Sequence, residues 1–295
     1  MIVIDNGIRM TSLIKAVQDR CGFLLVQGLL EKEPNGWRVL IPEKTKFAAL
    51  PEERRAFEQD KGSWHVGAGG CLMVLHCTDV SVALMRYRDA GAPSYGDHWT
   101  LGSGLTASIE EIVRPLHVAV RECIEEFGVV TPRGIVIPTF GDDELDGIVR
   151  GAVRSSDFLH QKATLKDFEA DSYLSAEASF RKVPGEETLT VAFEGVGETS
   201  TAGILAIDPN TRGIDLLKII DVKIPYRLAE IAIVDGEEDK YGRALNAPIG
   251  CMNIENLVPG RQFDAVFQHG QQQDSTGYVL KNMTPPLRAV IERFR

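Results

Sequence analysis

The pattern of apolar and polar residues along the chain predicts a mixed α/β protein. Short apolar runs that are rich in β-branched residues and bounded by Gly, Pro or Asp are typical of strands. Such runs lie at 134–139, 188–196, 202–207 and 214–220. Two more lie within 70–89, separated by Thr78 and Asp79, and predict a strand pair that leads into a loop. Two runs within 22–41 flank a Glu-Pro-Asn-Gly sequence and predict a hairpin with its turn near Asn35.

One segment has a clear helical period. From Pro115 to Phe127, apolar residues recur at spacings of four, three and four, which predicts a helix with a single apolar stripe. Pro115 suits the first helical position and Gly128 the residue after the end. Shorter helices are expected at 51–63, near 158–169, and after Pro285-Pro286.

Composition and length limit the class of protein and the number of domains. Of 295 residues, 44% are hydrophobic and 25% charged, as in ordinary globular proteins, which excludes disorder, a collagen-like repeat and a coiled coil. Length alone allows one or two domains. We expect an N-terminal β-rich extension over 1–62, made of the hairpin and a short helix, and one elaborated domain over 63–295. The extension is a candidate interface for a homodimer.

Charge and cysteine usage narrow the class of partner. With 42 acidic against 32 basic residues the formal charge is −10, which argues against a nucleic-acid polymer held on a basic surface. The five cysteines do not form a disulfide framework, and this favours a reducing compartment. No apolar stretch approaches the roughly 18 residues that a membrane span needs. We therefore expect a soluble, cytoplasmic protein with a small-molecule partner and no membrane partner.

Three glutamates in the predicted helix are unfavourably placed. Glu122, Glu125 and Glu126 stand at i, i+3 and i+4, so their carboxylates share one face. Glu122 and Glu126 repel each other, and two of the acids lie at the negative end of the helix dipole; each effect costs roughly a few tenths to about 1 kcal/mol. Arg121 offsets part of this cost. A solvated charged face is one explanation, and a cation site is the other.

The flanking residues favour the cation site. The segment 121–129, Arg-Glu-Cys-Ile-Glu-Glu-Phe-Gly-Val, resembles the second half of the Nudix box, R-E-U-x-E-E-x-G-U with U apolar, at every position. A chance match to its five fixed residues in such a chain is on the order of one in a thousand or less. Upstream, Gly104 and Glu110 match the G-x5-E that opens the box, and residues 99–104 resemble the W-x-L-P-G-G that introduces it.

The segment also departs from the family pattern. Ten residues separate Glu110 from Arg121, three more than in the family, and we place the extra residues in the loop around 111–114. Gly102 and Ser103 replace the usual Pro-Gly, and Ile109 stands at a usual Gly. In the family Glu110 supports the arginine through a salt bridge, and Glu111 is the alternative for this role. Close correspondence covers 99–129.

The resemblance implies a Nudix-like α/β/α sandwich with a mixed sheet and a metal-dependent hydrolase. It implies that Mg²⁺ or Mn²⁺ binds to Glu122, Glu125, Glu126 and the carbonyl of Gly104, and that Arg121 orients the acids. Hard cations of this kind prefer oxygen ligands, and they neutralise the repulsion of clustered carboxylates.

The resemblance leaves more than one candidate residue for the general base and for the substrate contacts. Family members take the base from a box glutamate, here Glu122, or from an acid on a later loop, for which Glu194 and Glu198 are candidates. Arg86 and Arg88 end a strand near the box and can reach a phosphate, although alternating basic residues at a strand end are also common on solvated faces.

The implied reaction is hydrolysis of the pyrophosphate bond in a nucleoside diphosphate-X substrate, such as ADP-ribose or a dinucleotide. One alternative is a Nudix-like nucleotide-binding or regulatory module without turnover. Another is isomerisation of isopentenyl diphosphate on the same scaffold. His65, Cys71, His76 and Cys77 match no zinc spacing, and we expect them to pack in the core.

Overall fold

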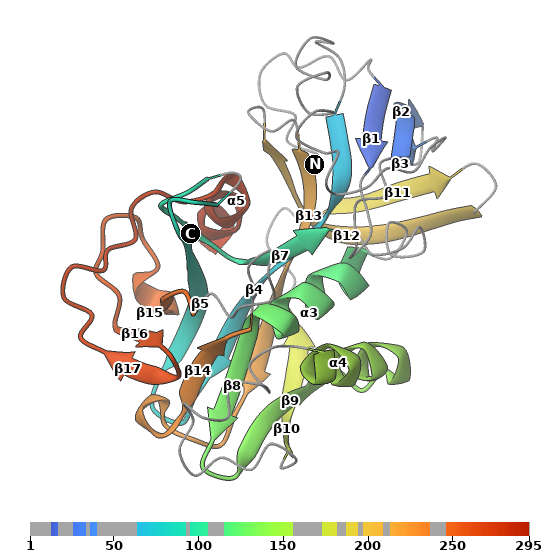
Figure 1. Cartoon of the computed structure of the whole chain (residues 1–295). Helices are drawn as coiled ribbons and strands as arrows, with labels where there is room; N and C mark the ends of the chain where they lie inside the picture. The colour runs from blue at the N-terminus through green and yellow to red at the C-terminus, as the bar shows by residue number, and fades with distance from the viewer. Residues whose placement is uncertain are drawn as a thin grey trace. The chain divides into compact units, whose positions relative to one another are not determined.

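The computed structural model describes residues 13–16, 26–33, 36–39, 64–92, 95–105, 115–155, 173–181, 187–193, 197–208, 213–236 and 246–294. In these segments the protein is a mixed α/β structure dominated by sheet (Figure 1). The helices are α3 (Pro115–Glu126), α4 (Asp143–Ser155), α5 (Pro285–Phe294) and the short 3₁₀ helices η3 (Leu228–Glu230) and η4 (Ile254–Asn256). The strands are β1 (Leu13–Ala16), β2 (Val26–Glu33), β3 (Gly36–Val39), β4 (Trp64–His76), β5 (Ser81–Arg88), β6 (His98–Thr100), β7 (Gly102–Leu105), β8 (Phe127–Thr131), β9 (Gly134–Thr139), β10 (Tyr173–Phe180), β11 (Glu187–Phe193), β12 (Gly197–Asp208), β13 (Gly213–Lys223), β14 (Ala232–Asp235), β15 (Ile249–Asn253), β16 (Ala265–Gln268) and β17 (Gln271–Gln273).

The chain divides into two compact units. The first unit comprises Met1–Gly70, Ser103–Ala119 and Lys182–Lys218, and the second comprises Cys71–Gly102, Val120–Arg181 and Ile219–Arg295. The N-terminal residues are thus grouped with strands from the middle of the chain, and an N-terminal extension that stands by itself is not supported. The predicted boundary between residues 62 and 63 stays a prediction.

Strand pairing in the first unit confirms the N-terminal hairpin. β2 and β3 pair antiparallel with Glu33 opposite Gly36. β1 pairs antiparallel with β2 and parallel with the first residues of β4. β3 lies parallel to β11, which pairs antiparallel with β12.

The second unit contains a mixed sheet, as the sequence predicts. β4 and β5 form an antiparallel pair in which His76 faces Ser81, and β5 also pairs with β6 and β15. β8 pairs antiparallel with β9 and with β14. β10 runs parallel to β9 and antiparallel to β13. The prediction that helices cover both faces of this sheet in a Nudix-like sandwich stays a prediction.

Helix α3 begins at Pro115, as its period predicts, and ends at Glu126, one residue before the predicted end, where the chain passes directly into β8. Val120 and Cys123 of the predicted stripe are buried, but Val118, Ala119 and Ile124 are buried too, so the buried surface of α3 is wider than a single stripe. Phe127, expected in the helix, is instead the first residue of β8 and is fully buried. No loop therefore separates α3 from β8.

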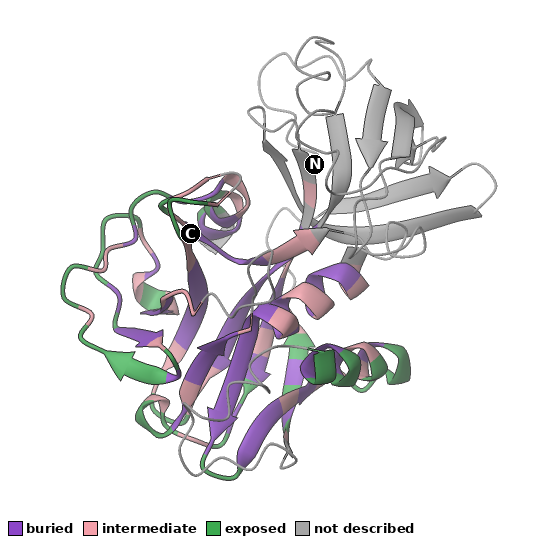
Figure 2. Ribbon diagram, in the orientation of Figure 1, coloured by how far each residue is buried: buried purple, intermediate pink, exposed green. Residues whose placement is uncertain are grey.

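Helix α4 is absent from the sequence prediction. It packs against β9 through Leu145, Val149, Ala152 and Val153, while its other face is exposed (Figure 2). Asp142 caps it by accepting hydrogen bonds from the backbone N–H groups of residues 144 and 145.

The other expected helices have different outcomes. The terminal helix is present as α5. The helices expected at 51–63 and 158–169 lie outside the described residues. No helix in the described segments combines the length and the apolar character that crossing a bilayer requires.

Candidate functional site

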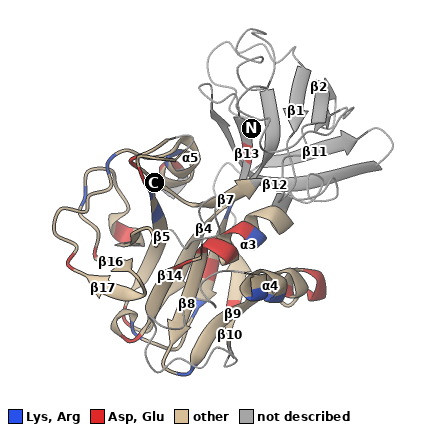
Figure 3. Ribbon diagram, in the orientation of Figure 1, with Lys and Arg blue, Asp and Glu red and all other residues tan. Residues whose placement is uncertain are grey.

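The last two turns of α3 carry the four charged residues of the predicted box. Nη1 of Arg121 lies 2.5 Å from Oε1 of Glu122 and donates to Oε2 of Glu125 at 3.1 Å. The other oxygen of Glu125, Oε1, accepts from the hydroxyl of Ser155 at the end of α4, at 3.1 Å. Figure 3 shows this end of α3 in the colours of acidic and basic residues. The arginine holds two of the carboxylates, and α4 helps to position one of them.

Glu126 is the most buried of the three acids, with 8% of its surface exposed. It stands one turn from Glu122 at the negative end of the helix dipole, where a buried carboxylate is unfavourable. Its backbone carbonyl accepts from the N–H of Gly236 at 3.1 Å, which ties the end of α3 to the strand β14. Burial raises the pKa of the neighbouring thiol of Cys123, and Cys71 and the charge of Glu126 add to this, so the thiol stays protonated.

The acids fit a hard divalent cation by donor type, because all three offer carboxylate oxygens at i, i+3 and i+4. Their arrangement does not form a ready metal site: no group of three acidic, histidine or cysteine side chains in the described segments is placed to hold a metal ion. Two of the carboxylates are bonded to Arg121 instead. A cation and the arginine therefore compete for the same oxygens.

The remaining predicted metal and base residues stay predictions. Gly104 lies in β7 and belongs to the first unit. Glu110, its alternative Glu111, and Glu194 lie outside the described residues. Glu198 lies in β12, also in the first unit, opposite Ala192 of β11.

The structure gives a physical reason for one departure from the family pattern. A Cβ atom added to Gly102 would lie 2.8 Å from the Cα of Cys123 and 3.0 Å from the ring of Phe127. The thiol of Cys123 also donates to the carbonyl of Cys71 at 3.7 Å. The backbone at residue 102 thus approaches α3 so closely that only glycine fits.

The two arginines predicted to bind phosphate have different environments. Arg86 is 4% exposed and forms two contacts with Asp235, from Nε to Oδ1 at 2.8 Å and from Nη2 to Oδ2 at 3.3 Å. Oδ2 of Asp235 also accepts from the N–H of Ala247 at 2.7 Å. Arg86 is thereby part of a buried ion pair, which sequence reasoning did not foresee because its partner lies 149 residues away.

Arg88, two residues further along β5, is half-buried. Its Nε is buried and has no hydrogen-bond partner among the described residues. The prediction that either arginine contacts substrate stays a prediction.

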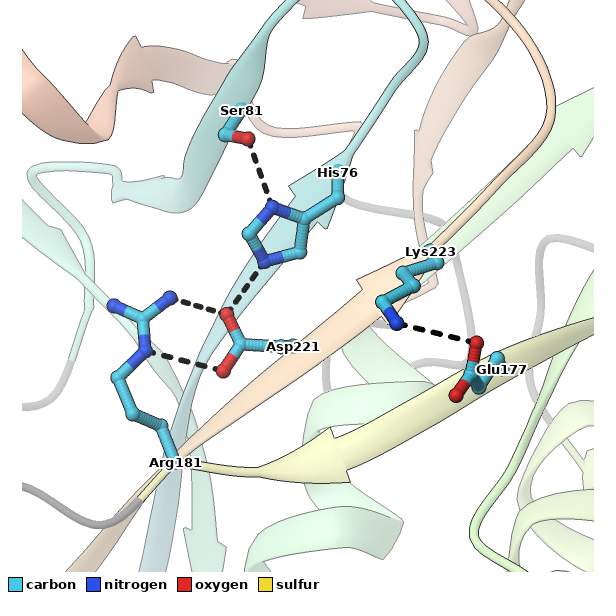
Figure 4. Close-up of polar contacts among 6 residues, drawn as sticks. All are labelled: His76, Ser81, Glu177, Arg181, Asp221 and Lys223. Atoms are coloured by element: carbon cyan, nitrogen blue, oxygen red, sulfur yellow. Dashed lines mark hydrogen bonds and ion pairs between the residues drawn. The ribbon is translucent and has the colours of Figure 1, made fainter.

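A second polar cluster joins three strands of the second unit (Figure 4). Nδ1 of His76 is 2.8 Å from the hydroxyl of Ser81, and Nε2 is 2.6 Å from Oδ1 of Asp221. Arg181 binds the same carboxylate through Nε and Nη2. These are the residue types of a hydrolytic triad, but the two ring nitrogens have exchanged their usual partners and the arginine neutralises the acid. We assign the cluster to the stability of the sheet.

Core packing, expected for four His and Cys residues, holds for Cys71, which is fully buried. His76 is instead half-buried and hydrogen-bonded. Cys77 is partly buried, and its burial, with the nearby Asp79 adding to it, raises the pKa of its thiol to about 12. The side chain of His65 is outside the described part of the chain.

No protein-family model matches the chain, and no curated protein matches it. A solved Nudix hydrolase from M. smegmatis, RenU, is similar at 14% identity with a TM-score of 0.32, over 78% of this chain and 83% of that chain. A bifunctional NMN adenylyltransferase/ADP ribose pyrophosphatase from Francisella tularensis is similar at 12% identity with a TM-score of 0.35. That alignment covers 84% of this chain and 46% of the other, so the chain spans less than half of that protein. Similarity at this level does not define the fold.

Proposed function

We propose that this protein is a metal-dependent hydrolase of the Nudix type, which cleaves the pyrophosphate bond of a nucleoside diphosphate-X substrate such as ADP-ribose or a dinucleotide. One observation carries the proposal: α3 runs without interruption from Pro115 to Glu126 and bears the whole charged half of the box. The three extra residues of this chain precede the helix in the sequence, so the i, i+3, i+4 spacing of the acids is intact.

The residues of α3 divide the work as follows. Glu122, Glu125 and Glu126, with the carbonyl of Gly104, would hold Mg²⁺ or Mn²⁺. The ion would supply polarisation of a phosphoryl oxygen and would offset charge on the leaving phosphate. Arg121 orients two of the carboxylates, to which it is already bonded.

Two glutamates are assigned to proton transfer and to the support of the box. Glu122 is the first choice for the base that takes a proton from the attacking water. The resemblance assigns the support of Arg121 to Glu110, which lies outside the described residues. Localisation in the cytoplasm and assembly as a homodimer remain proposals beside this one.

A regulatory module without turnover is the second candidate, and one observation favours it. Arg121 occupies oxygens of both Glu122 and Glu125, which an active metal site needs. In such a module the arginine would keep the acids neutralised, and the protein would bind a nucleotide without cleaving it.

The experiment is a measurement of Mg²⁺- or Mn²⁺-dependent release of mononucleotide from ADP-ribose, NADH, dinucleoside polyphosphates and nucleotide sugars. Glu125→Gln and Glu126→Gln should each lower the rate by at least 10²-fold, because each removes a metal ligand. The matched control is Glu292→Gln, which changes an exposed glutamate of α5 and should leave the rate unchanged. Full activity in both box variants would refute the assignment of the metal ligands. Nucleotide binding without turnover in the wild type would select the regulatory module.

A further inference from the structure

Arg88 is the last residue of β5. Side chains alternate along a strand, so Arg88 lies on the same face as Arg86. Arg86 is neutralised by Asp235. The Nε of Arg88 is buried, and within the described part of the chain it has no hydrogen-bond partner. Buried N–H groups of a cation are normally paired with an acceptor. No described residue supplies the acceptor for this N–H group.

A histidine lies directly across the strand pair. Arg88 faces His98 of β6 in the antiparallel register, which brings the two side chains onto one face about 5 Å apart at Cβ. Nδ1 of His98 is 2.7 Å from the carbonyl of Gly96 and donates to it, which leaves Nε2 to donate to an anion when both ring nitrogens carry a proton. Both side chains are half-buried.

The loop before β6 places an aromatic ring beside this pair. Tyr95 contacts the ring of His98 edge-on, with ring centres 5.4 Å apart. Tyr95 and Asp97 have φ angles of 51° and 59°, a conformation that non-glycine residues adopt at a cost. The chain thus accepts local strain to form the turn that presents Tyr95 and His98.

The nearby carboxylates are bonded elsewhere. Oδ1 of Asp89 accepts from the N–H of Gly91 at 2.8 Å. Oδ1 of Asp97 accepts from the hydroxyl of Tyr87 at 3.2 Å, and Tyr87 packs against Trp99. The N–H of Asp97 donates to the carbonyl of Arg88 at 2.9 Å, but neither carboxylate forms an ion pair with the guanidinium of Arg88 among the described residues.

A chain of contacts links this position to the acidic end of α3. The carbonyl of Glu126 accepts from Gly236, the residue after Asp235, and Asp235 binds Arg86. Arg88 follows two residues later, about 7 Å along the strand. The acidic end of α3 and the basic position of Arg88 are therefore linked by contacts within the same unit.

We propose that Arg88 and His98 form an anion subsite, which binds a phosphate group of the nucleotide substrate. Arg86 is excluded from this role because Asp235 already neutralises it. The identity of the ligand as a nucleotide rests on the proposed function, whereas the binding of a phosphate group by the anion subsite does not.

The test measures binding of AMP and of inorganic phosphate to the full chain in EDTA by calorimetry, so that no metal contributes. Arg88→Gln should weaken AMP binding at least tenfold, and His98→Gln several-fold. The matched control is Arg133→Gln, an exposed arginine between β8 and β9, which should leave the affinity unchanged. The ring ¹⁵N resonances of His98 should shift on addition of AMP in the wild type, a response that a purely structural role of His98 would not give.

Unchanged AMP affinity in Arg88→Gln, or no AMP binding by the wild type at millimolar concentration, would overturn the anion subsite. If Arg88→Gln does not fold, the same two outcomes are judged on His98→Gln and on the NMR shift. Phosphate and AMP binding that depend on Arg88, in a wild type without hydrolase activity, would support the anion subsite and refute the proposed function. Metal-dependent hydrolysis with a KM that Arg88→Gln leaves unchanged would support the proposed function and refute the anion subsite.

Discussion

The ion pair of Arg86 and Asp235 allows a sharp prediction about stability. Their side chains are 5% and 1% exposed, and Asp235 also accepts from the N–H of Ala247. Asp235→Asn keeps the shape but removes the carboxylate charge that pairs with the buried guanidinium. Breaking a buried pair in this way costs about 3–5 kcal/mol. At about 2–4 °C per kcal/mol for a chain of this size, the midpoint of thermal unfolding should fall by roughly 6–20 °C.

The double variant Arg86→Met, Asp235→Leu separates the loss of the ion pair from the cost of the buried charge that remains in Asp235→Asn. It removes both charges, so it should recover most of the stability that Asp235→Asn loses. Denaturant unfolding gives the free energies. The control is Glu177→Gln, which removes the exposed pair with Lys223 and should change stability by about 0.5 kcal/mol or less.

The reasoning would be refuted if Asp235→Asn lost less than about 1 kcal/mol. A stable Arg86→Met protein with weakened substrate binding would also refute it. That result would show that Arg86 contacts substrate, as the sequence alone suggested.

Three further predictions follow from single positions. Because its raised pKa of about 12 keeps the thiol of Cys77 protonated, Cys77 should react with iodoacetamide at pH 8 roughly a thousandfold more slowly than a free cysteine; mass spectrometry of a Cys21→Ser protein measures this, and ordinary reactivity would contradict it. Gly102→Ala should destabilise the protein by about 1–3 kcal/mol in denaturant unfolding, since its Cβ would meet the backbone of Cys123; unchanged stability would mean that α3 moves freely. Asp221→Asn should cost about 1–3 kcal/mol in thermal unfolding, because it removes the carboxylate charge that Arg181 and His76 share; a neutral effect would remove the structural role assigned to the cluster.

Local patterns predicted the local parts of the fold. The period of residues 115–127 gave the start of α3 at Pro115, and the Asn35-Gly36 signal gave the hairpin of β2 and β3. Both depend on residues that are neighbours in the sequence, where spacing alone determines which side chains share a face.

Helix α4 shows where local patterns fail. Gly147 and Gly151 lie inside it, and glycine lowers helix propensity by about 1 kcal/mol each. The helix is stabilised by the cap at Asp142 and by burial of Val149 and its neighbours against β9. Tertiary packing thus outweighs local propensity, and the sequence pattern alone did not predict this helix.

The environment of each candidate site residue depends on distant parts of the chain. The sequence placed Arg86 and Arg88 together at a strand end, but the partner of Arg86 comes from β14. Likewise, Ser155 reaches Glu125 from another helix. Such contacts decide which arginine is neutralised and which acid is positioned, and no spacing rule within one segment predicts them.

The central claim is that the acids of α3 bind a divalent cation on which hydrolysis depends. The most direct measurement is a titration of Mn²⁺ by electron paramagnetic resonance on the wild type and on Glu126→Gln, with ADP-ribose hydrolysis followed in the same samples. The account predicts that the wild type binds Mn²⁺ and that hydrolysis rises with occupancy. In Glu126→Gln, binding should weaken at least tenfold and hydrolysis should be lost. Equal Mn²⁺ affinity in both proteins, or hydrolysis that persists in Glu126→Gln, would contradict it.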